Sequence, residues 1–204
     1  MKLIVATHNR KKLTELKRIF LPLGIDAVTD RELGVALTEV EETGDTFEQN
    51  AFLKAEGACR ETGLPAVADD SGLMVDALDG APGVYSARYA GEGASDADRN
   101  DKLLRALDGV PEARRGAKFV SAICCVFPNG DRVEARGECP GTIGTRTAGS
   151  GGFGYDPLFV VEGGRTYAEL SDDEKDAISH RGVAMRLFAE RLREYLRRYP
   201  SVCG

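Results

Sequence analysis

The sequence predicts an α/β fold in which one mixed sheet is flanked by helices. Near the N-terminus, apolar runs typical of buried strands alternate with helical patterns, as in parallel sheets. In the middle of the chain, a β-branched and aromatic run leads through a turn into a second run, which indicates an antiparallel hairpin. The 204 residues contain no internal repeat or long linker, so we expect a single domain over residues 1–204, with two lobes around a cleft.

The first segment has the pattern of a strand, a turn and a helix. Residues 3–6 form a short apolar run, as in a buried strand. Apolar residues then recur with the helical period at Leu13, Leu16, Phe20 and Leu23. We expect Asn9 to cap this helix. The polar loop of residues 7–12 would then join the carboxyl end of a strand to the amino end of a helix, where exposed N–H groups favour an anion.

The alternation continues in the next fifty residues. A capping box, which predicts a helix running to about Glu61, is formed by Thr46-Phe47-Glu48-Gln49. Residues 65–70 are the next predicted strand. We expect Ser71-Gly72 to turn the chain away after it, because both residue types are common in turns.

The second half of the chain begins with a predicted helix that Ser95 caps and Gly109 ends. Residues 117–127 read as a strand, and Pro128-Asn129-Gly130 marks a hairpin into residues 132–137. A final helix is predicted by the spacing of Ala184, Leu187, Phe188, Leu192, Tyr195, Leu196 and Tyr199.

Composition is that of an ordinary soluble protein, with 42% hydrophobic and 29% charged residues. The sequence shows no apolar run of membrane-spanning length and no signal peptide, so we expect a cytoplasmic protein with no membrane partner. The five cysteines form no CxxC pair, and there are only two histidines. We therefore expect reduced thiols and no zinc site.

The distribution of charge bears on the partner. A net charge of -6 argues against a nonspecific nucleic-acid binder, which would be basic overall. Residues 1–20 nevertheless carry six Lys and Arg against one acid, whereas residues 26–62 carry ten acids against three bases. A basic segment and an acidic segment together suit a ligand made of a metal ion and phosphates, although scattered surface charge also produces such blocks.

Two adjacent carboxylates, Asp69 and Asp70, come at the end of a predicted strand. Neighbouring carboxylates repel each other, and leaving water raises their free energy. A hard divalent cation can compensate both costs by binding the charged oxygens. The alternative is a solvated turn with an Asx cap. Glu41-Glu42 offers a second source of carboxylate, although paired glutamates are usually solvated. Whether Asp69 is a ligand or only a neighbour of Asp70 stays open.

Residues 149–154 match the pattern G-x-G-x-x-G. Tyr155-Asp156-Pro157 follows at once, so the helix required by a dinucleotide fingerprint cannot begin there. The segment is instead predicted to be a glycine-rich loop that can approach a ligand closely. Phe153 and Tyr155 would offer it flat apolar faces that suit a nucleobase. The alternative is a simple connection whose aromatic residues belong to the core.

A dense polar segment, residues 175–181, precedes the final helix. It could be a helix start with Ser179 as the cap. Basic side chains at a helix amino terminus oppose the helix dipole, however, so stability explains them poorly. Lys175, His180 and Arg181 could instead donate hydrogen bonds to the oxygens of a ligand.

Taken together, these segments resemble the inosine triphosphate pyrophosphatase family, also called the Ham1-like family. The matching segments occur in family order and span nearly the whole chain: residues 7–12, 41–44, 46–47 with 50–51, 68–73, 80–89, 152–157 and 179–181. One departure is His8, where the family usually has glycine. A side chain at this position would narrow the phosphate loop.

The resemblance implies the hydrolysis of dITP, ITP and XTP to the monophosphate and pyrophosphate, which removes these purines from the nucleotide pool. It also implies Mg²⁺ as the cofactor, an elongated fold and a homodimer. Asp70 would be the general base and a metal ligand, and Glu41 the other metal ligand. The implied substrate-binding residues are Thr7, His8, Asn9, Arg10, Lys11, Lys12, Ser71, Phe153, Gly154, Tyr155, Asp156, Lys175, His180 and Arg181.

Three other functions compete with this one. A Maf-like pyrophosphatase acting on modified pyrimidine nucleotides would share the general architecture. A nucleotide-sensing module would bind without hydrolysis, but it has no need for Asp70, Glu41 and Lys12. A purely structural interaction protein would leave the segment of residues 175–181 unexplained.

Overall fold

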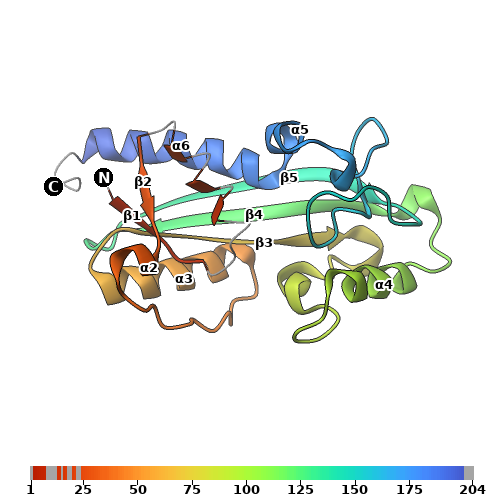
Figure 1. The fold of residues 1–204 in the computed structure, drawn as a ribbon, viewed down its shortest axis with the longest axis horizontal. Coiled ribbons are helices and arrows are strands. Elements are labelled where there is room, and N and C mark those ends of the chain that lie inside the picture. The colour runs from red at the N-terminus through yellow and green to blue at the C-terminus, as the bar shows by residue number, and fades with distance from the viewer. Residues whose placement is uncertain (1, 8–12, 15, 18–19, 22–23, 200–204) are drawn as a thin grey trace. The chain divides into compact units, whose positions relative to one another are not determined.

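A mixed β-sheet with flanking helices forms the fold, as predicted (Figure 1). The computed structural model describes residues 2–7, 13–14, 16–17, 20–21 and 24–199. Within them the sheet has six strands in the order β2-β1-β3-β4-β5-β6. Strand β1 pairs in parallel with β2 and β3, whereas β5 and β6 are antiparallel.

The bounds of the strands are Lys2–Val5 (β1), Asp26–Val28 (β2), Ala66–Val75 (β3), Gly116–Val126 (β4), Arg132–Ile143 (β5) and Phe159–Val160 (β6). The α-helices are Asp30–Leu33 (α2), Phe47–Thr62 (α3), Asp96–Ala106 (α4), Asp172–Ile178 (α5) and His180–Arg198 (α6). Short 3-10 helices cover Asp76–Leu78, Gly83–Arg88, Glu112–Arg114 and Tyr167–Glu169.

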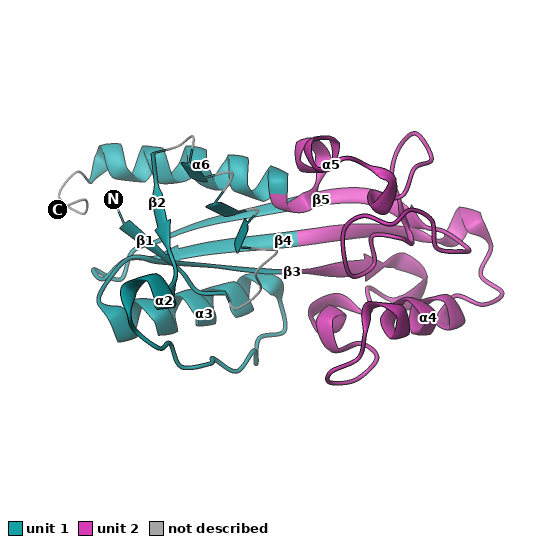
Figure 2. Ribbon diagram, viewed as in Figure 1, with its two compact units in different colours: residues 1–70, 121–137, 182–204 teal, residues 71–120, 138–181 magenta. Residues whose placement is uncertain are grey.

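The chain divides into two compact units (Figure 2). Unit 1 comprises residues 1–70, 121–137 and 182–204, and unit 2 comprises residues 71–120 and 138–181. Strands β3, β4 and β5 each contribute residues to both units. The single domain over residues 1–204 stays a prediction.

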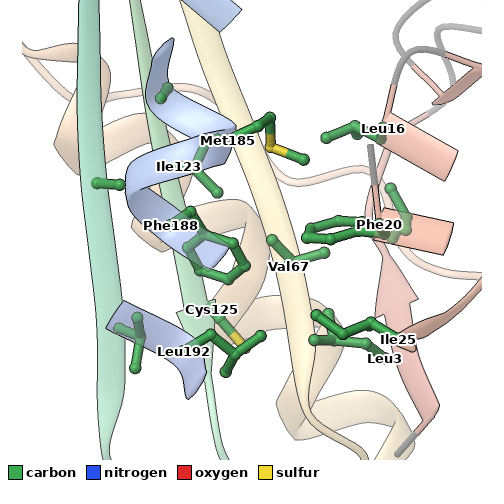
Figure 3. Packing of buried hydrophobic residues seen from close by; sticks show 14 of the residues in the cluster. Leu3, Leu16, Phe20, Ile25, Val67, Ile123, Cys125, Met185, Phe188 and Leu192 are labelled. Atoms are coloured by element: carbon green, nitrogen blue, oxygen red, sulfur yellow. The ribbon is translucent and has the colours of Figure 1, made fainter. Parts of the chain in front are cut away.

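The core of unit 1 forms where α6 packs on the sheet. Alternate strand residues point into it because successive side chains of a strand face opposite sides. Figure 3 shows Val67, Ile123 and Cys125 beside Met185 and Phe188 of α6. Leu16 and Phe20, which recur with the helical period, are buried in the same cluster. Of the periodic residues predicted for the last helix, Ala184, Phe188 and Leu192 are buried in this core, whereas Leu187 and Tyr199 are exposed.

Helix α3 covers the other face of the sheet in unit 1 (Figures 1 and 2). Most of its buried residues are small, among them Ala51, Ala55 and Ala58, although Phe47 is also buried. The Thr46 hydroxyl accepts a hydrogen bond from the Gln49 amide at 3.2 Å and caps the helix, as predicted. Gly63 ends the helix with a left-handed φ of 67°.

Unit 2 has a separate, aromatic core. Leu103 and Leu107 of the α4 segment pack with Phe119, Phe159 and Tyr167. The rings of Phe119 and Phe159 meet edge to face with centroids 4.6 Å apart, a favoured arrangement of aromatic pairs. Each unit thus buries its own apolar residues, which gives each a rigid frame.

The predicted turn at Ser71-Gly72 is wrong, because β3 continues through both residues to Val75. Leu73 and Val75 are completely buried in the core of unit 2, and this burial outweighs the local turn preference. The Leu73 amide donates a hydrogen bond to the Ser86 hydroxyl at 2.9 Å. Helix α4 also ends at Ala106, earlier than predicted.

Four of the five cysteines lie within the described residues, and Cys203 lies outside them. Cys59, Cys124, Cys125 and Cys139 are all free and buried. Cys125 belongs to the unit 1 core and its neighbour Cys124 does not, as expected for adjacent strand residues. Burial raises the pKa of the Cys124 thiol to about 12. Among the described residues, no helix combines the length and apolar character needed to cross a bilayer.

Phe188→Ala should lower the free energy of unfolding by about 3–5 kcal/mol, because a fully buried ring is removed and a cavity remains. The control is the preceding residue, Leu187, which is 36% exposed. Leu187→Ala should lower the same free energy by less than about 1 kcal/mol. Urea unfolding followed by circular dichroism measures both changes. Equal losses would contradict the placement of Phe188 in the core.

Candidate active site

A group of carboxylates gathers around one lysine in unit 1. Strand β3 supplies Asp69 and Asp70, which are only 3% and 7% exposed. Lys54 of α3 places its Nζ 2.6 Å from Glu42 Oε1 and 3.4 Å from Asp70 Oδ1. We call Glu42, Lys54, Asp69 and Asp70 the carboxylate cluster. It contains a half-buried ammonium that contacts acids from different segments of the chain.

The charge of Lys54 is maintained by these acids. Burial alone would lower the pKa of Lys54, but the carboxylates of Asp70, Asp69 and Glu42 outweigh burial and raise the pKa above its ordinary value. The side chain therefore stays an ammonium at neutral pH. In return, it supplies the positive charge that buried carboxylates require.

Asn50 fixes the geometry of the carboxylate cluster. This completely buried side chain donates from Nδ2 to Asp70 Oδ2 at 3.3 Å and accepts at Oδ1 from the Gly44 amide at 2.8 Å. A Cβ on Gly44 would lie 2.7 Å from Asn50 Oδ1 and 2.6 Å from Gln49 Cβ. Only glycine allows this close approach. The segment that carries Glu42 is thus held directly against α3.

The two neighbouring glutamates differ in their surroundings. Glu41, the predicted metal ligand, is exposed, whereas Glu42 is half-buried and bound to Lys54. The sequence motifs did not single out Glu42, Lys54 or Asn50 individually. A signal was present, since Asn50 and Lys54 stand four residues apart on α3, and side chains at this spacing lie on the same face of a helix.

The predicted phosphate-binding loop lies only partly within the described residues. Thr7 follows β1, is half-buried, and donates its amide to Val5 O at 3.0 Å. Val5 pairs with Val67 in parallel register, so Thr7 and Asp69 follow at the same end of neighbouring strands. His8, Asn9, Arg10, Lys11 and Lys12 lie outside the described residues.

A second group of predicted residues meets in unit 2, around residues 149–157, which we call the glycine loop. No helix follows it, as predicted. The Phe153 amide and Lys175 Nζ both donate to Asp156 Oδ2, at 2.8 and 2.6 Å. Asp156 is 3% exposed, and burial raises its pKa although Lys175 opposes the shift. The buried carboxylate therefore closes the loop and anchors Lys175.

Two cations approach the half-buried ring of Phe153. Lys175 Nζ lies 5.1 Å and Arg181 Cζ 5.7 Å from its centroid, within the range of cation–π contacts. Arg181 Nη2 also donates to Ser71 Oγ at 3.3 Å. The ring of His180 stacks on Phe119 with centroids 4.8 Å apart. The structure thus brings together the predicted residues Ser71, Phe153, Asp156, Lys175, His180 and Arg181 in unit 2.

Gly154 and Tyr155 complete the loop. Tyr155 is buried, and its hydroxyl donates to Ser86 O at 2.8 Å, so this ring belongs to the core rather than to an open face. Lys175 stands on α5, a helix that the sequence reading did not separate from the segment before α6. The signal was the capping box of Ser171 and Glu174. Ser179 lies between the two helices.

Within the described ranges, the side chains of His, Cys, Asp and Glu form no group of three or more with the spacing of metal ligands. An Mg²⁺ site needs fewer, because this ion usually keeps several waters and binds one or two carboxylates together with substrate phosphates. Asp70 and Glu42, brought together by Lys54, fit such a site.

Lys54→Gln should lower the free energy of unfolding by about 3–5 kcal/mol, because the variant leaves buried carboxylates without their cation. Lys118→Gln is the control, since Lys118 pairs with Glu138 at 2.9 Å on the surface. It should change stability by less than about 1 kcal/mol. Chemical unfolding with a chelator present measures both.

The pH dependence of this difference has a defined sign. The folded-state pKa of Lys54 is raised, so its stabilisation is fully present below the unfolded pKa of about 10.4 and is lost as pH rises through the folded value. The gap between wild type and Lys54→Gln should be constant through neutral pH. A gap that closes near neutrality would contradict a buried ammonium in this cluster.

Known proteins similar to this chain agree on one family. A model of the Ham1 family matches residues 3–191. The dITP/XTP pyrophosphatase of Yersinia pseudotuberculosis serotype I (strain IP32953) is 50% identical over 196 residues, covering 95% of this chain and 98% of that protein. The dITP/XTP pyrophosphatase of Nocardia farcinica (strain IFM 10152) is 53% identical over 188 residues, covering 91% of each.

The fold agrees as well. A solved structure of a HAM1 protein from Coxiella burnetii has a TM-score of 0.88 and 42% identity, covering 95% of this chain and 99% of that one. The predicted α/β fold class and the family resemblance are therefore confirmed. This chain belongs to the Ham1 family, because the family model matches residues 3–191 and a relative is 50% identical over 95% of the chain.

Proposed function

We propose that this protein hydrolyses dITP, ITP and XTP to the nucleoside monophosphate and pyrophosphate, and so removes these purines from the nucleotide pool. The observation that carries the proposal is the carboxylate cluster, in which Lys54 holds Glu42 and Asp70 together. The names of the relatives from Yersinia and Nocardia, dITP/XTP pyrophosphatase, support the substrate class.

Mg²⁺ is the proposed cofactor, with Asp70 and Glu42 as its protein ligands. The geometry favours Glu42 over the exposed Glu41, because only Glu42 is held beside Lys54, which also contacts Asp70. When bound there with a triphosphate, Mg²⁺ would neutralise phosphate charge and acidify a bound water. Hard oxygen ligands of this kind suit Mg²⁺ better than softer metals.

The chemistry of the chain's own residues is mainly positioning and charge neutralisation. Water attacks the α-phosphorus and pyrophosphate leaves in line. Asp70 orients this water and accepts its proton, while Asn50 fixes one Asp70 oxygen and Lys54 lies beside the other. Thr7 and residues 8–12 are proposed to hold the phosphate chain, since the sequence predicts a strand before them and a helix after them.

The glycine loop is the proposed binding site for the purine base. Phe153 offers a stacking face, and the donors Lys175 and Arg181 lie beside its ring. His180 is the third proposed donor of the base site. Hypoxanthine and xanthine present a carbonyl oxygen where adenine carries an amino group. Donors therefore favour the former, and a buried donor facing adenine would go unpaired at a cost of about 1–3 kcal/mol.

We further propose a cytoplasmic homodimer that binds neither nucleic acid nor membrane. The family resemblance supports the dimer. The net charge of -6 supports the absence of a nucleic-acid partner.

Asp70→Asn should lower kcat for dITP by about 10²–10⁴-fold, because the amide cannot accept the proton of the attacking water. The melting temperature should change little, since an amide oxygen can still accept the bond from Asn50. Steady-state kinetics with scanning calorimetry measures both quantities. Wild-type turnover in this variant would remove Asp70 from the mechanism.

Glu42 and Glu41 form a matched pair for testing the metal site. Glu42→Gln should raise the Mg²⁺ concentration for half-maximal activity by about tenfold or more, because a charged ligand is lost. Glu41→Gln should leave it unchanged, since Glu41 is exposed. Titration of activity with Mg²⁺ decides between them. The reverse result would assign the ligand to Glu41.

The function itself is tested by a product assay with Mg²⁺ on dITP, XTP, GTP, ATP and a modified pyrimidine triphosphate, resolving pyrophosphate from orthophosphate. Pyrophosphate released mainly from dITP and XTP is the expected result. A pyrimidine preference would favour a Maf-like activity. Binding without turnover would favour a nucleotide sensor.

A further inference from the structure

Two polar side chains of α4, Asp96 and Asn100, bind the backbone of the glycine loop at Gly154. Neither residue is among those proposed to bind the base. Asp96 Oδ2 accepts a hydrogen bond from the Gly154 amide at 2.8 Å. Asn100 Nδ2 donates to the Gly154 carbonyl oxygen at 2.9 Å. The residues are 58 and 54 positions from Gly154 in the sequence, so the contact is made by the fold of unit 2 and not by local turn geometry.

Both side chains have a fixed orientation. Asn100 is 4% exposed, and its Nδ2 also donates to Asp96 O at 2.8 Å, so two carbonyl oxygens determine which end of the amide faces the loop. The second Asp96 oxygen, Oδ1, pairs with Arg99. Packing of Leu103 in the unit 2 core holds α4 itself in place.

These bonds fix two consecutive peptide groups. The Gly154 amide belongs to the peptide group that follows Phe153, and the Gly154 carbonyl to the one that precedes Tyr155. Peptide groups are planar, so holding both leaves the chain little freedom on either side of Gly154. Gly154 has a φ of 63°, a conformation that other residues rarely adopt. The position of the Phe153 ring is therefore coupled to α4.

We propose that Asp96 and Asn100 are positioning residues that set the place of Phe153 for stacking on the purine base. This inference rests on the proposed function, because it assigns the glycine loop to the base. The contact between Asp156 and Lys175 closes the loop from its other side. Asp96 and Asn100 act on substrate binding through Gly154 and do not touch the reacting phosphates.

A purely structural role in capping α4 is the competing explanation, and Asp98 provides the matched control. Asp98 stands in the same first turn and accepts bonds from the Ser95 amide and hydroxyl at 2.9 and 2.6 Å. It completes the capping box of the helix but has no contact with the glycine loop among the bonds of the described residues. Asp98→Ala therefore weakens the helix start and leaves the Gly154 contacts in place.

The experiment compares Asp96→Ala, Asn100→Ala, Asp96→Asn and Asp98→Ala with wild type. The readouts are kcat and KM for dITP, the dissociation constant of IMP by calorimetry, and the melting temperature. Asp96→Ala and Asn100→Ala should each raise KM and the IMP dissociation constant by about tenfold, with kcat changed by less than about threefold. Asp96→Asn keeps an acceptor for the Gly154 amide and should stay within about threefold of wild type.

Asp98→Ala should lower the melting temperature without changing KM. The proposal is overturned if Asp96→Ala and Asn100→Ala fold but bind IMP and dITP as wild type does, or if Asp98→Ala raises KM as much as they do. If Asp96→Ala does not fold, Asn100→Ala gives the same decision. A wild-type protein that neither binds IMP nor hydrolyses dITP would overturn the proposed function, and this inference with it.

Discussion

The ammonium of Lys54 is the interaction on which the proposed reaction depends. Strand β3 carries Asp69 and Asp70 at consecutive positions and buries both, which lost hydration of two carboxylates disfavours. Lys54 compensates this charge and at the same time ties Glu42 to α3. The close approach of Gly44 to Asn50 makes that contact possible. In the proposed reaction, this cluster would receive the triphosphate together with its metal ion.

The proposed base site is held by aromatic packing and by one buried carboxylate. In unit 2 the rings of Phe119, Tyr167 and His180 lie nearly parallel, so the aromatic core continues into His180, a proposed base-binding residue. Asp156 is buried because it has partners on both sides of the loop. Core packing and ligand recognition therefore share residues. This sharing explains why the glycine loop, which lacks regular secondary structure, is nevertheless held at several points.

A capping box predicted α3, and a β-branched run followed by a turn predicted the hairpin of β4 and β5. Hydrophobic periodicity predicted the last helix, because burial of one face leaves a repeat in the sequence. It could not show that β3 continues past Ser71, since the force that extends the strand comes from Leu73 and Val75 packing in the unit 2 core. The sequence also could not show which side chains of the proposed site contact one another. The ion pair between Lys54 and Glu42 shows that Glu42, rather than the exposed Glu41, lies toward Lys54. Lys54 itself has no distinguishing motif.

Hydrolysis of dITP in water enriched in heavy oxygen tests the central claim most directly. If Asp70 directs water to the α-phosphorus, mass spectrometry should find the label in the dIMP product and none in pyrophosphate. Label in pyrophosphate would mean attack at the β-phosphorus, and label in orthophosphate would mean stepwise loss of the terminal phosphate. Either result would contradict the role given to the carboxylate cluster.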